Sequence, residues 1–244
     1  MPLLRKMQYP RYDAHRHLPD GQSVAETSVV NGTSPEDWAD VLAKAKNHPD
    51  LIPAIGLHPW KVNDAPEDWQ AHFLGLIGLA GAVGEIGLDQ WIDGHDIKRQ
   101  EAAFCWQLKV AAERNLPVSI HSLKASEVLL SNLRQSALPR RGIHLHAYSG
   151  SAEQVEQFAE MGAYFSFHAG QFKANAKKAP AAVQAIPRDR LLIETDAPNT
   201  LDASSDASDF LNRGYDIIAG LRGVEVEALA EQVAANFQRY FLDE

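Results

Sequence analysis

Eight short β-rich segments are spread along the chain, and helical patterns separate most of them. The segments cover residues 12–17, 24–31, 51–58, 81–88, 118–121, 142–149, 163–169 and 191–197. The helical patterns cover residues 35–46, 96–114, 125–135, 152–161 and 180–186. Regular alternation of strand and helix is typical of a parallel sheet. Eight such units closing on themselves predict an α/β fold of the (β/α)8 TIM-barrel type.

The length of the chain sets the number of domains. A chain of 244 residues lies within the range of one α/β barrel. With 45% hydrophobic and only 23% charged residues, it can bury a large core, and no tract suggests disorder. We therefore predict a single barrel domain over residues 1–244.

Composition also bears on location and partners. The longest uncharged apolar stretch, residues 73–84, is shorter than the roughly 20 residues that span a bilayer, and residues 1–7 lack the apolar run of a signal peptide. The lone cysteine, Cys105, allows no internal disulfide and is predicted to be a small core residue. We expect a cytoplasmic protein without a membrane partner. The formal charge of −9 argues against a broad basic surface for nucleic acid, although a metal pair would still attract phosphate locally.

The link between the first two predicted strands is unusually short. Little more than residues 19–23 connects them, whereas parallel neighbours usually need a dozen residues or more. An extended link of about seven residues spans roughly 23 Å, enough to run back along a strand of ~17–20 Å. We therefore predict that the first crossover helix is missing or shortened. The exposed apolar surface would be covered by the N-terminal segment or by a partner subunit, which makes a homo-oligomer through this region one expectation.

Histidine and acidic residues stand at the ends of the predicted strands. His15 and His17 alternate on the first strand, so their imidazoles point to the same side and can share a metal ion. The later strands end in Glu85, His121, His146 and Asp196. The carboxyl ends of barrel strands meet at one rim, where active sites lie and where residues that serve stability alone would usually be apolar. The sequence therefore predicts a metal site at this rim.

Seven ordered motifs carry a family resemblance. They begin at residues 13, 56, 84, 116, 146, 172 and 191 and read DAHRHL, GLHP, GEIGLD, LPVSIH, HAYSG, FKAN and LLIETDAP. Together they resemble the TatD family of metal-dependent hydrolases, within the amidohydrolase superfamily. GEIGLD followed by ETDAP is specific to the family, whereas the His-x-His pair is shared across the superfamily. The resemblance implies a barrel hydrolase, typically a deoxyribonuclease.

The resemblance also implies a dinuclear metal site. Position by position, it makes His15, His17 and Asp196 ligands of one ion and His121 and His146 ligands of the other, with Glu85 bridging. Mixed nitrogen and oxygen donors suit Zn²⁺ or Mn²⁺, and Mg²⁺ is compatible where substrate phosphates complete its shell. Two such ions support phosphodiester hydrolysis by a metal-activated water. Asp196 is expected to act both as a ligand and as the base for that water.

Four further residues have two readings each. Glu194 alternates with Asp196, and either orients a ligand histidine or forms a structural pair. His58 either donates to a substrate phosphate or caps its own loop. Lys173 either holds a non-reacting phosphate or is simply solvated. His144 faces the barrel interior at a position that is generally apolar in relatives, where it either supports a ligand or fills a layer.

Two rim segments depart from the family pattern. His121 is followed by Ser122, Leu123 and Lys124, where relatives commonly carry an arginine, and residues 199–209 are acidic rather than basic and proline-rich. Both changes weaken DNA as the substrate while leaving the metal ligands intact. Trp60 and Trp91, after the third and fourth strands, either stack on a base or pack at the rim.

Three functions remain in order of preference. The first is a 3′-5′ exonuclease that prefers single-stranded DNA. The second is a metallohydrolase of a small phosphoester, lactone or amide, with the amide less favoured because Glu85 stands where some superfamily members use a modified lysine. The third is a metal-binding scaffold without turnover, which would bind a partner near the first strand.

Overall fold

The computed structural model describes residues 9–18, 27–201 and 205–243. Eight parallel strands form one sheet in sequence order. They are β1 (Tyr12–Arg16), β2 (Thr27–Asn31), β3 (Leu51–Ile55), β4 (Ala82–Asp89), β5 (Val118–Leu123), β6 (Ile143–Leu145), β7 (Ala163–Phe167) and β8 (Leu191–Ile193). Beyond the strand ends, the Asp196 amide donates to His15 O at 2.9 Å and the His17 amide donates to Ala197 O at 2.7 Å. These two bonds join the last strand to the first at the rim, and the predicted barrel is confirmed.

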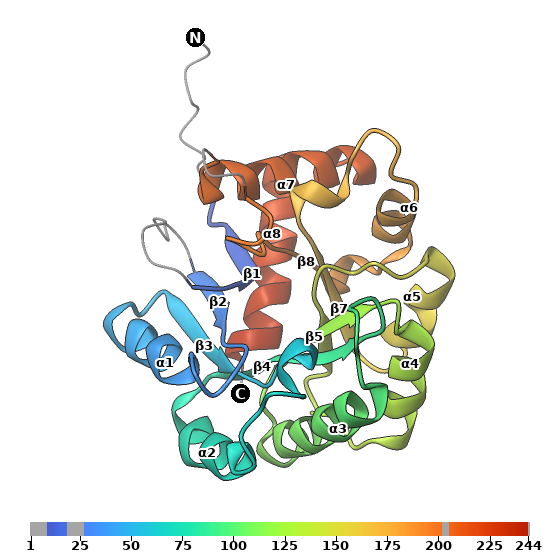
Figure 1. Ribbon diagram of the computed structural model, residues 1–244. Helices are drawn as coiled ribbons and strands as arrows, with labels where there is room; N and C mark the ends of the chain where they lie inside the picture. The colour runs from blue at the N-terminus through green and yellow to red at the C-terminus, as the bar shows by residue number, and fades with distance from the viewer. Residues whose placement is uncertain (1–8, 19–26, 202–204, 244) are drawn as a thin grey trace.

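Helices surround the strands on the outside (Figure 1). They are α1 (Trp38–Asn47), α2 (Trp69–Leu76), α3 (Ile97–Arg114), α4 (Ser126–Gln135), α5 (Ala152–Ala159), α6 (Lys178–Ala185), α7 (Ala207–Arg222) and α8 (Val226–Phe237). The five predicted helical patterns correspond to α1, α3, α4, α5 and α6. Helices α2, α7 and α8 were not predicted individually. No helix in the described ranges is long and apolar enough to cross a membrane.

The short connection from β1 to β2 carries no described helix, and α1 follows β2. Residues 19–26, on which the predicted loss of the first crossover helix depends, lie outside the described residues. The same holds for residues 1–8, one of the two segments expected to cover the gap. Leu18, at the end of the described part of this link, packs against Val30, Val41 and Leu51.

The C-terminal segment closes the amino-terminal end of the barrel. Helix α8 runs on into a short π-helical segment, η5 (Gln238–Leu242). The Tyr240 hydroxyl accepts from the amide of Val118, the first residue of β5, at 3.0 Å and donates to the carbonyl of the same residue at 2.8 Å. The Asn236 amide donates to the carbonyl of Leu191, the first residue of β8, at 2.8 Å. Phe237, Tyr240 and Phe241 pack in one buried cluster with Tyr164. Because this end is plugged, access to the barrel interior is left to the opposite rim.

Candidate metal centre

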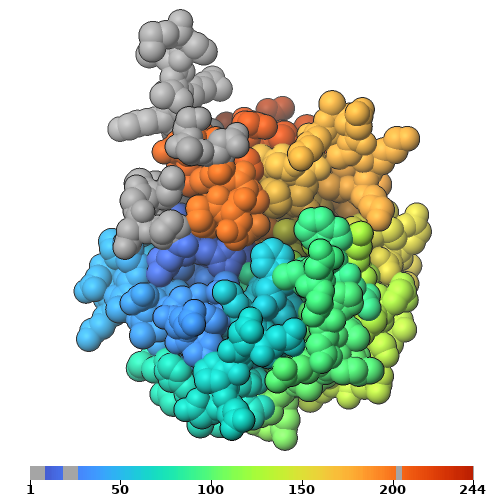
Figure 2. All heavy atoms as spheres, in the orientation of Figure 1, coloured from blue at the N-terminus to red at the C-terminus, as the bar shows by residue number. Residues whose placement is uncertain are grey.

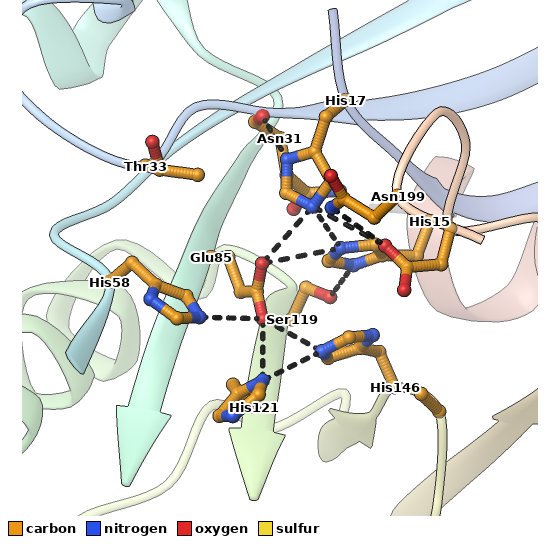
Figure 3. A network of polar contacts seen from close by, with 12 residues as sticks. His15, His17, Asn31, Thr33, His58, Glu85, Ser119, His121, His146 and Asn199 are labelled. Atoms are coloured by element: carbon orange, nitrogen blue, oxygen red, sulfur yellow. Dashed lines mark hydrogen bonds and ion pairs between the residues drawn. The ribbon is translucent and has the colours of Figure 1, made fainter. Parts of the chain in front are cut away.

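All six predicted metal-binding residues meet at the carboxyl ends of the strands, around Glu85 (Figure 3). The Glu85 side chain is only 3% exposed. Its Oε2 lies 3.5 Å from His15 Nε2 and 3.2 Å from His17 Nε2. Its Oε1 lies 2.7 Å from His146 Nε2 and 3.0 Å from His121 Nδ1. Each oxygen of one buried carboxylate therefore faces a different pair of imidazoles, which is the arrangement that a bridging ligand requires.

Asp196 adds a second carboxylate on the side of His15 and His17. Its Oδ1 lies 3.6 Å from His17 Nε2, and one ligand atom from each of the three residues falls within 4.8 Å of the other two. The Asp196 backbone is left-handed, with φ of 51°. That conformation costs a non-glycine residue about 1 kcal/mol, and the bond from the Asp196 amide to His15 O helps to hold it. The turn out of β8 thus places the carboxylate beside the histidines of β1.

Two glycines of the GEIGLD motif let the neighbouring strands come close enough for this arrangement. A Cβ on Gly84 would lie 2.6 Å from Asn31 Oδ1 and 2.9 Å from Ser119 Cβ. Gly87 has φ of 149°, and a Cβ there would lie 2.0 Å from the carbonyl oxygen of His121. Side chains at either position would push β4 away from β2 or β5. The glycines therefore allow Glu85 to reach both halves of the centre.

His58 also joins the centre, and the structure supports both of its predicted readings. Its Nε2 lies 3.3 Å from Glu85 Oε1, while its Nδ1 accepts from the Trp60 amide at 3.1 Å. A neutral imidazole that accepts at Nδ1 carries its proton at Nε2. His58 is thus set up as a hydrogen-bond donor toward the centre, rather than as a metal ligand, while it also caps its own loop.

Asp89 is a contributor to which the sequence analysis gave no role. His121 Nε2 lies 2.9 Å from Asp89 Oδ2, and the Trp60 indole donates to the same oxygen at 2.7 Å. The other oxygen, Oδ1, accepts from the Trp91 amide at 2.7 Å. A carboxylate on the far nitrogen of a ligand histidine fixes the orientation and basicity of that ring. The available signal was spacing, because Asp89 lies four residues after Glu85 on β4 and so faces the same side.

Glu194 and His144 lie beneath the centre, fully buried. Glu194 Oε1 accepts from the Ala147 amide at 2.8 Å and lies 3.5 Å from His146 Nδ1, which is a contact between charges rather than a hydrogen bond. His144 faces the barrel interior, as predicted, between the hydroxyls of Ser119 and Ser166. The position of Glu194 agrees with its reading as a residue that orients a ligand histidine.

A cavity of about 590 Å³ opens above the centre. Figure 2 shows the corresponding face of the molecule, where segments from the first, third, fifth and last parts of the barrel meet near the middle. Among the predicted binding residues, His58 lines the cavity, but Lys173 is exposed and is not among the lining residues. Trp60 and Lys61 do line it, and Trp60 is 48% exposed. A phosphate-binding role for Lys173 stays a prediction.

The buried charges of the centre shift one another's pKa values. Burial alone would raise the pKa of Glu85, but the neighbouring imidazoles of His146, His58 and His121 outweigh it and hold that pKa well below its usual range. Burial also opposes protonation of His146, yet Glu85 and Glu194 raise the pKa of His146 well above its usual value. Burial raises the pKa of Asp196 to about 6. Without metal, the centre therefore holds protons that a cation would displace.

Comparison with known proteins agrees with this geometry. The family model described as TatD related DNase matches residues 13–242. The uncharacterized metal-dependent hydrolase YjjV of Escherichia coli K12 is 32% identical and covers 87% of this chain and 85% of its own. The 3′-5′ ssDNA/RNA exonuclease TatD of Erwinia tasmaniensis is 29% identical and covers 87% of each. The crystal structure of YjjV superposes with a TM-score of 0.85 at 27% identity, over 96% of this chain and 98% of that one.

Proposed function

The chain belongs to the TatD family of metal-dependent hydrolases, and from that membership we propose that it is a 3′-5′ exonuclease acting on single-stranded DNA. The observation that carries the proposal is the division of the Glu85 carboxylate between two groups of imidazoles. A bridged ion pair is the usual device for in-line phosphodiester hydrolysis. Relatives named as a 3′-5′ ssDNA/RNA exonuclease and as a deoxyribonuclease support this substrate class.

The residues present fit two divalent ions. One ion is assigned to His15, His17 and Asp196 and the other to His121 and His146, with Glu85 between them. The donors are buried, converge from separate strands and mix nitrogen with oxygen, which suits Zn²⁺ or Mn²⁺ and permits Mg²⁺ when phosphate completes the shell. When bound, such ions lower the pKa of water and offset charge on phosphoryl oxygens.

Asp196 is the residue assigned to move the proton. Its side chain is 16% exposed and lines the cavity, whereas the Glu85 side chain is 3% exposed and is surrounded by imidazoles. A base must lie within hydrogen-bond reach of the water that it deprotonates. Asp196 meets that requirement from the cavity wall, while Glu85 keeps its charge and holds the two halves together.

The substrate end of the site consists of Trp60 and Lys61. The Trp60 indole is held by Asp89, so its exposed ring forms a fixed surface on which a terminal base can stack. Lys61 lies next to it on the cavity wall and can pair with a phosphate. A cavity of about 590 Å³ suits one nucleotide at a strand end. These features favour a single-stranded terminus over a duplex.

The test uses metal-reconstituted protein and single-stranded DNA labelled at its 5′ end. Stepwise shortening from the 3′ end is expected, with loss on addition of chelator and a fall of about 10²- to 10⁴-fold in Asp196→Asn. Asp206→Asn is the matched control, because Asp206 caps α7 through backbone amides and takes no part in the centre. A protein that binds two ions but leaves the DNA intact would contradict the proposal.

A second candidate is hydrolysis of a small phosphoester. Lys61 is the only lysine or arginine among the described residues that line the cavity, and the whole chain carries a formal charge of −9. A polynucleotide usually needs more cationic contacts than that. Bis(p-nitrophenyl) phosphate, assayed beside DNA with the same two variants, separates the candidates. Turnover of the small ester alone would favour the second, and a lactone or an anilide then completes the substrate panel.

A further inference from the structure

A chain of polar contacts runs beneath the candidate metal centre from His15 to Glu194. His15 Nδ1 lies 2.7 Å from Ser119 Oγ, and Ser119 Oγ lies 3.4 Å from His144 Nδ1. His144 Nε2 lies 2.6 Å from Ser166 Oγ, which donates to Glu194 Oε2. All five residues have zero exposure, so bulk water does not compete for these contacts. The chain crosses the barrel interior from β1 to the end of β8.

The direction of every hydrogen bond in this chain follows from the Glu194 carboxylate. An ionised carboxylate only accepts, and a serine hydroxyl has one proton to give. Ser166 gives its proton to Glu194 and must therefore accept from His144 Nε2–H. A neutral His144 then has its lone pair on Nδ1, where it accepts from Ser119. Ser119 in turn accepts from His15 Nδ1–H.

This order leaves His15 with its lone pair on Nε2. That atom lies 3.5 Å from Glu85 Oε2 and 3.1 Å from His17 Nε2, inside the candidate metal centre. The opposite order would put a proton on His15 Nε2 and block it as a ligand. Proton order in the chain therefore decides whether His15 can bind a cation.

We propose that Ser119, His144 and Ser166 are positioning residues that transmit the orienting effect of Glu194 to His15 and hold it in its metal-binding tautomer. The other oxygen of Glu194 lies 3.5 Å from His146 Nδ1. One buried carboxylate thus orients a histidine in each half of the centre, directly on one side and through three residues on the other. The inference rests on the proposed metal centre, but not on DNA as the substrate.

A purely structural role makes a different prediction. His144 lies near the aromatic plug, with ring centroids 6.2 Å from Tyr240 and 5.8 Å from Phe241. A residue that only filled this layer would change the free energy of unfolding without changing the tautomer of His15 or its affinity for metal. The test must therefore read the tautomer and the affinity directly.

Ser119→Ala, Ser166→Ala and the double variant test the transmission. Long-range ¹H–¹⁵N NMR of metal-free, ¹⁵N-histidine-labelled protein reads the His15 tautomer, and calorimetry reads Zn²⁺ affinity. In each single variant we expect His15 to lose its pure Nδ1–H form and the affinity to fall about 10- to 100-fold. Either substitution interrupts the same chain, so the double variant should be no weaker than the weaker single variant.

Ser136→Ala is the matched control, because its hydroxyl donates to Asn132 O at 2.8 Å on α4, away from the centre. His144→Leu should weaken Zn²⁺ binding as the serine variants do, and if it fails to fold, the serine pair still decides the matter. Additive losses in the double variant, or an unchanged His15 tautomer, would overturn the inference, as would absence of Zn²⁺ binding by the parent protein. Inactivity on DNA with these effects intact would remove only the nuclease proposal.

Discussion

Replacing Asp89 with asparagine removes the charge beside His121 while keeping the shape of the side chain. Asp89 Oδ2 faces two donors, the His121 ring at 2.9 Å and the Trp60 indole at 2.7 Å. Oδ1 faces two more, the amides of Trp91 at 2.7 Å and Ile92 at 3.1 Å. An asparagine has one oxygen, so either orientation of its amide turns an NH₂ group toward two donors. The substitution cannot satisfy both sides.

The size of the effect follows from these contacts. Hydrogen bonds to a charged group contribute about 1.5–3 kcal/mol each, so loss of the pair on one oxygen should lower the free energy of unfolding by about 3 kcal/mol. Removal of the carboxylate that orients a ligand histidine typically weakens metal binding 10- to 100-fold, which is about 1.4–2.7 kcal/mol. Asp89→Asn should therefore reduce both stability and the affinity of the half-site that contains His121.

Calorimetric titration of metal-free protein with Zn²⁺ and unfolding in urea measure the two effects separately. Asp96→Asn is the matched control, because Asp96 accepts from the amides of Lys98 and Arg99 at 3.1 Å each, at the exposed start of α3. Asparagine is an equally good cap, so neither quantity should change. If Asp89→Asn lowers stability but leaves Zn²⁺ affinity unchanged, Asp89 only fastens the loop after β4 and the reasoning about His121 is wrong.

Three further outcomes follow from the same geometry. Because burial raises the pKa of Asp196 to about 6 and Glu85 raises that of His146, both hold protons at pH 5 that a cation must displace, so Zn²⁺ affinity should rise from pH 5 to pH 7. Calorimetry in buffers of different ionisation enthalpy would show the released protons, and a flat profile would contradict this. Metal at about 100 times its Kd should add about 2.7 kcal/mol of stability, a rise in Tm of roughly 5–11 °C that chelator reverses in a thermal scan. Tyr240→Phe should cost about 1–3 kcal/mol in urea unfolding, because both polar groups of the Val118 backbone lose a partner, with Zn²⁺ affinity unchanged.

The metal-binding residues were predictable because two geometric rules fix them. Side chains two apart on a strand share a face, which pairs His15 with His17, and the carboxyl ends of barrel strands meet at one rim, which brings Glu85 and Asp196 to them. Neither rule depends on where a strand ends. The predicted segment 142–149 shows why ends are harder, since β6 stops at Leu145 and Ala147 takes a left-handed φ of 42°.

Residues whose roles depend on loop conformation were not predictable in the same way. His58 caps a turn and faces Glu85 at once because the turn at Pro59–Lys61 rotates its ring, and no strand period reports that rotation. Asp89 reaches His121 and Trp60 together only because that turn lies over the end of β4. The plug formed by α8 and η5 is likewise a tertiary event, since an apolar C-terminal helix reads the same wherever it packs.

The charge of the cavity wall ties substrate binding to the metal ions. Lys61 is the one lysine or arginine among its described residues, and it stands against the carboxylates of Glu85 and Asp196. A phosphodiester brings another negative charge into a space already rich in them, and its Coulomb energy there is unfavourable unless cations are present. Two divalent ions reverse that balance locally while the rest of the acidic surface stays repulsive. Substrate should therefore bind weakly to the metal-free protein as well as remain uncut, and a nucleotide that bound equally well with and without metal would place its phosphate outside the centre.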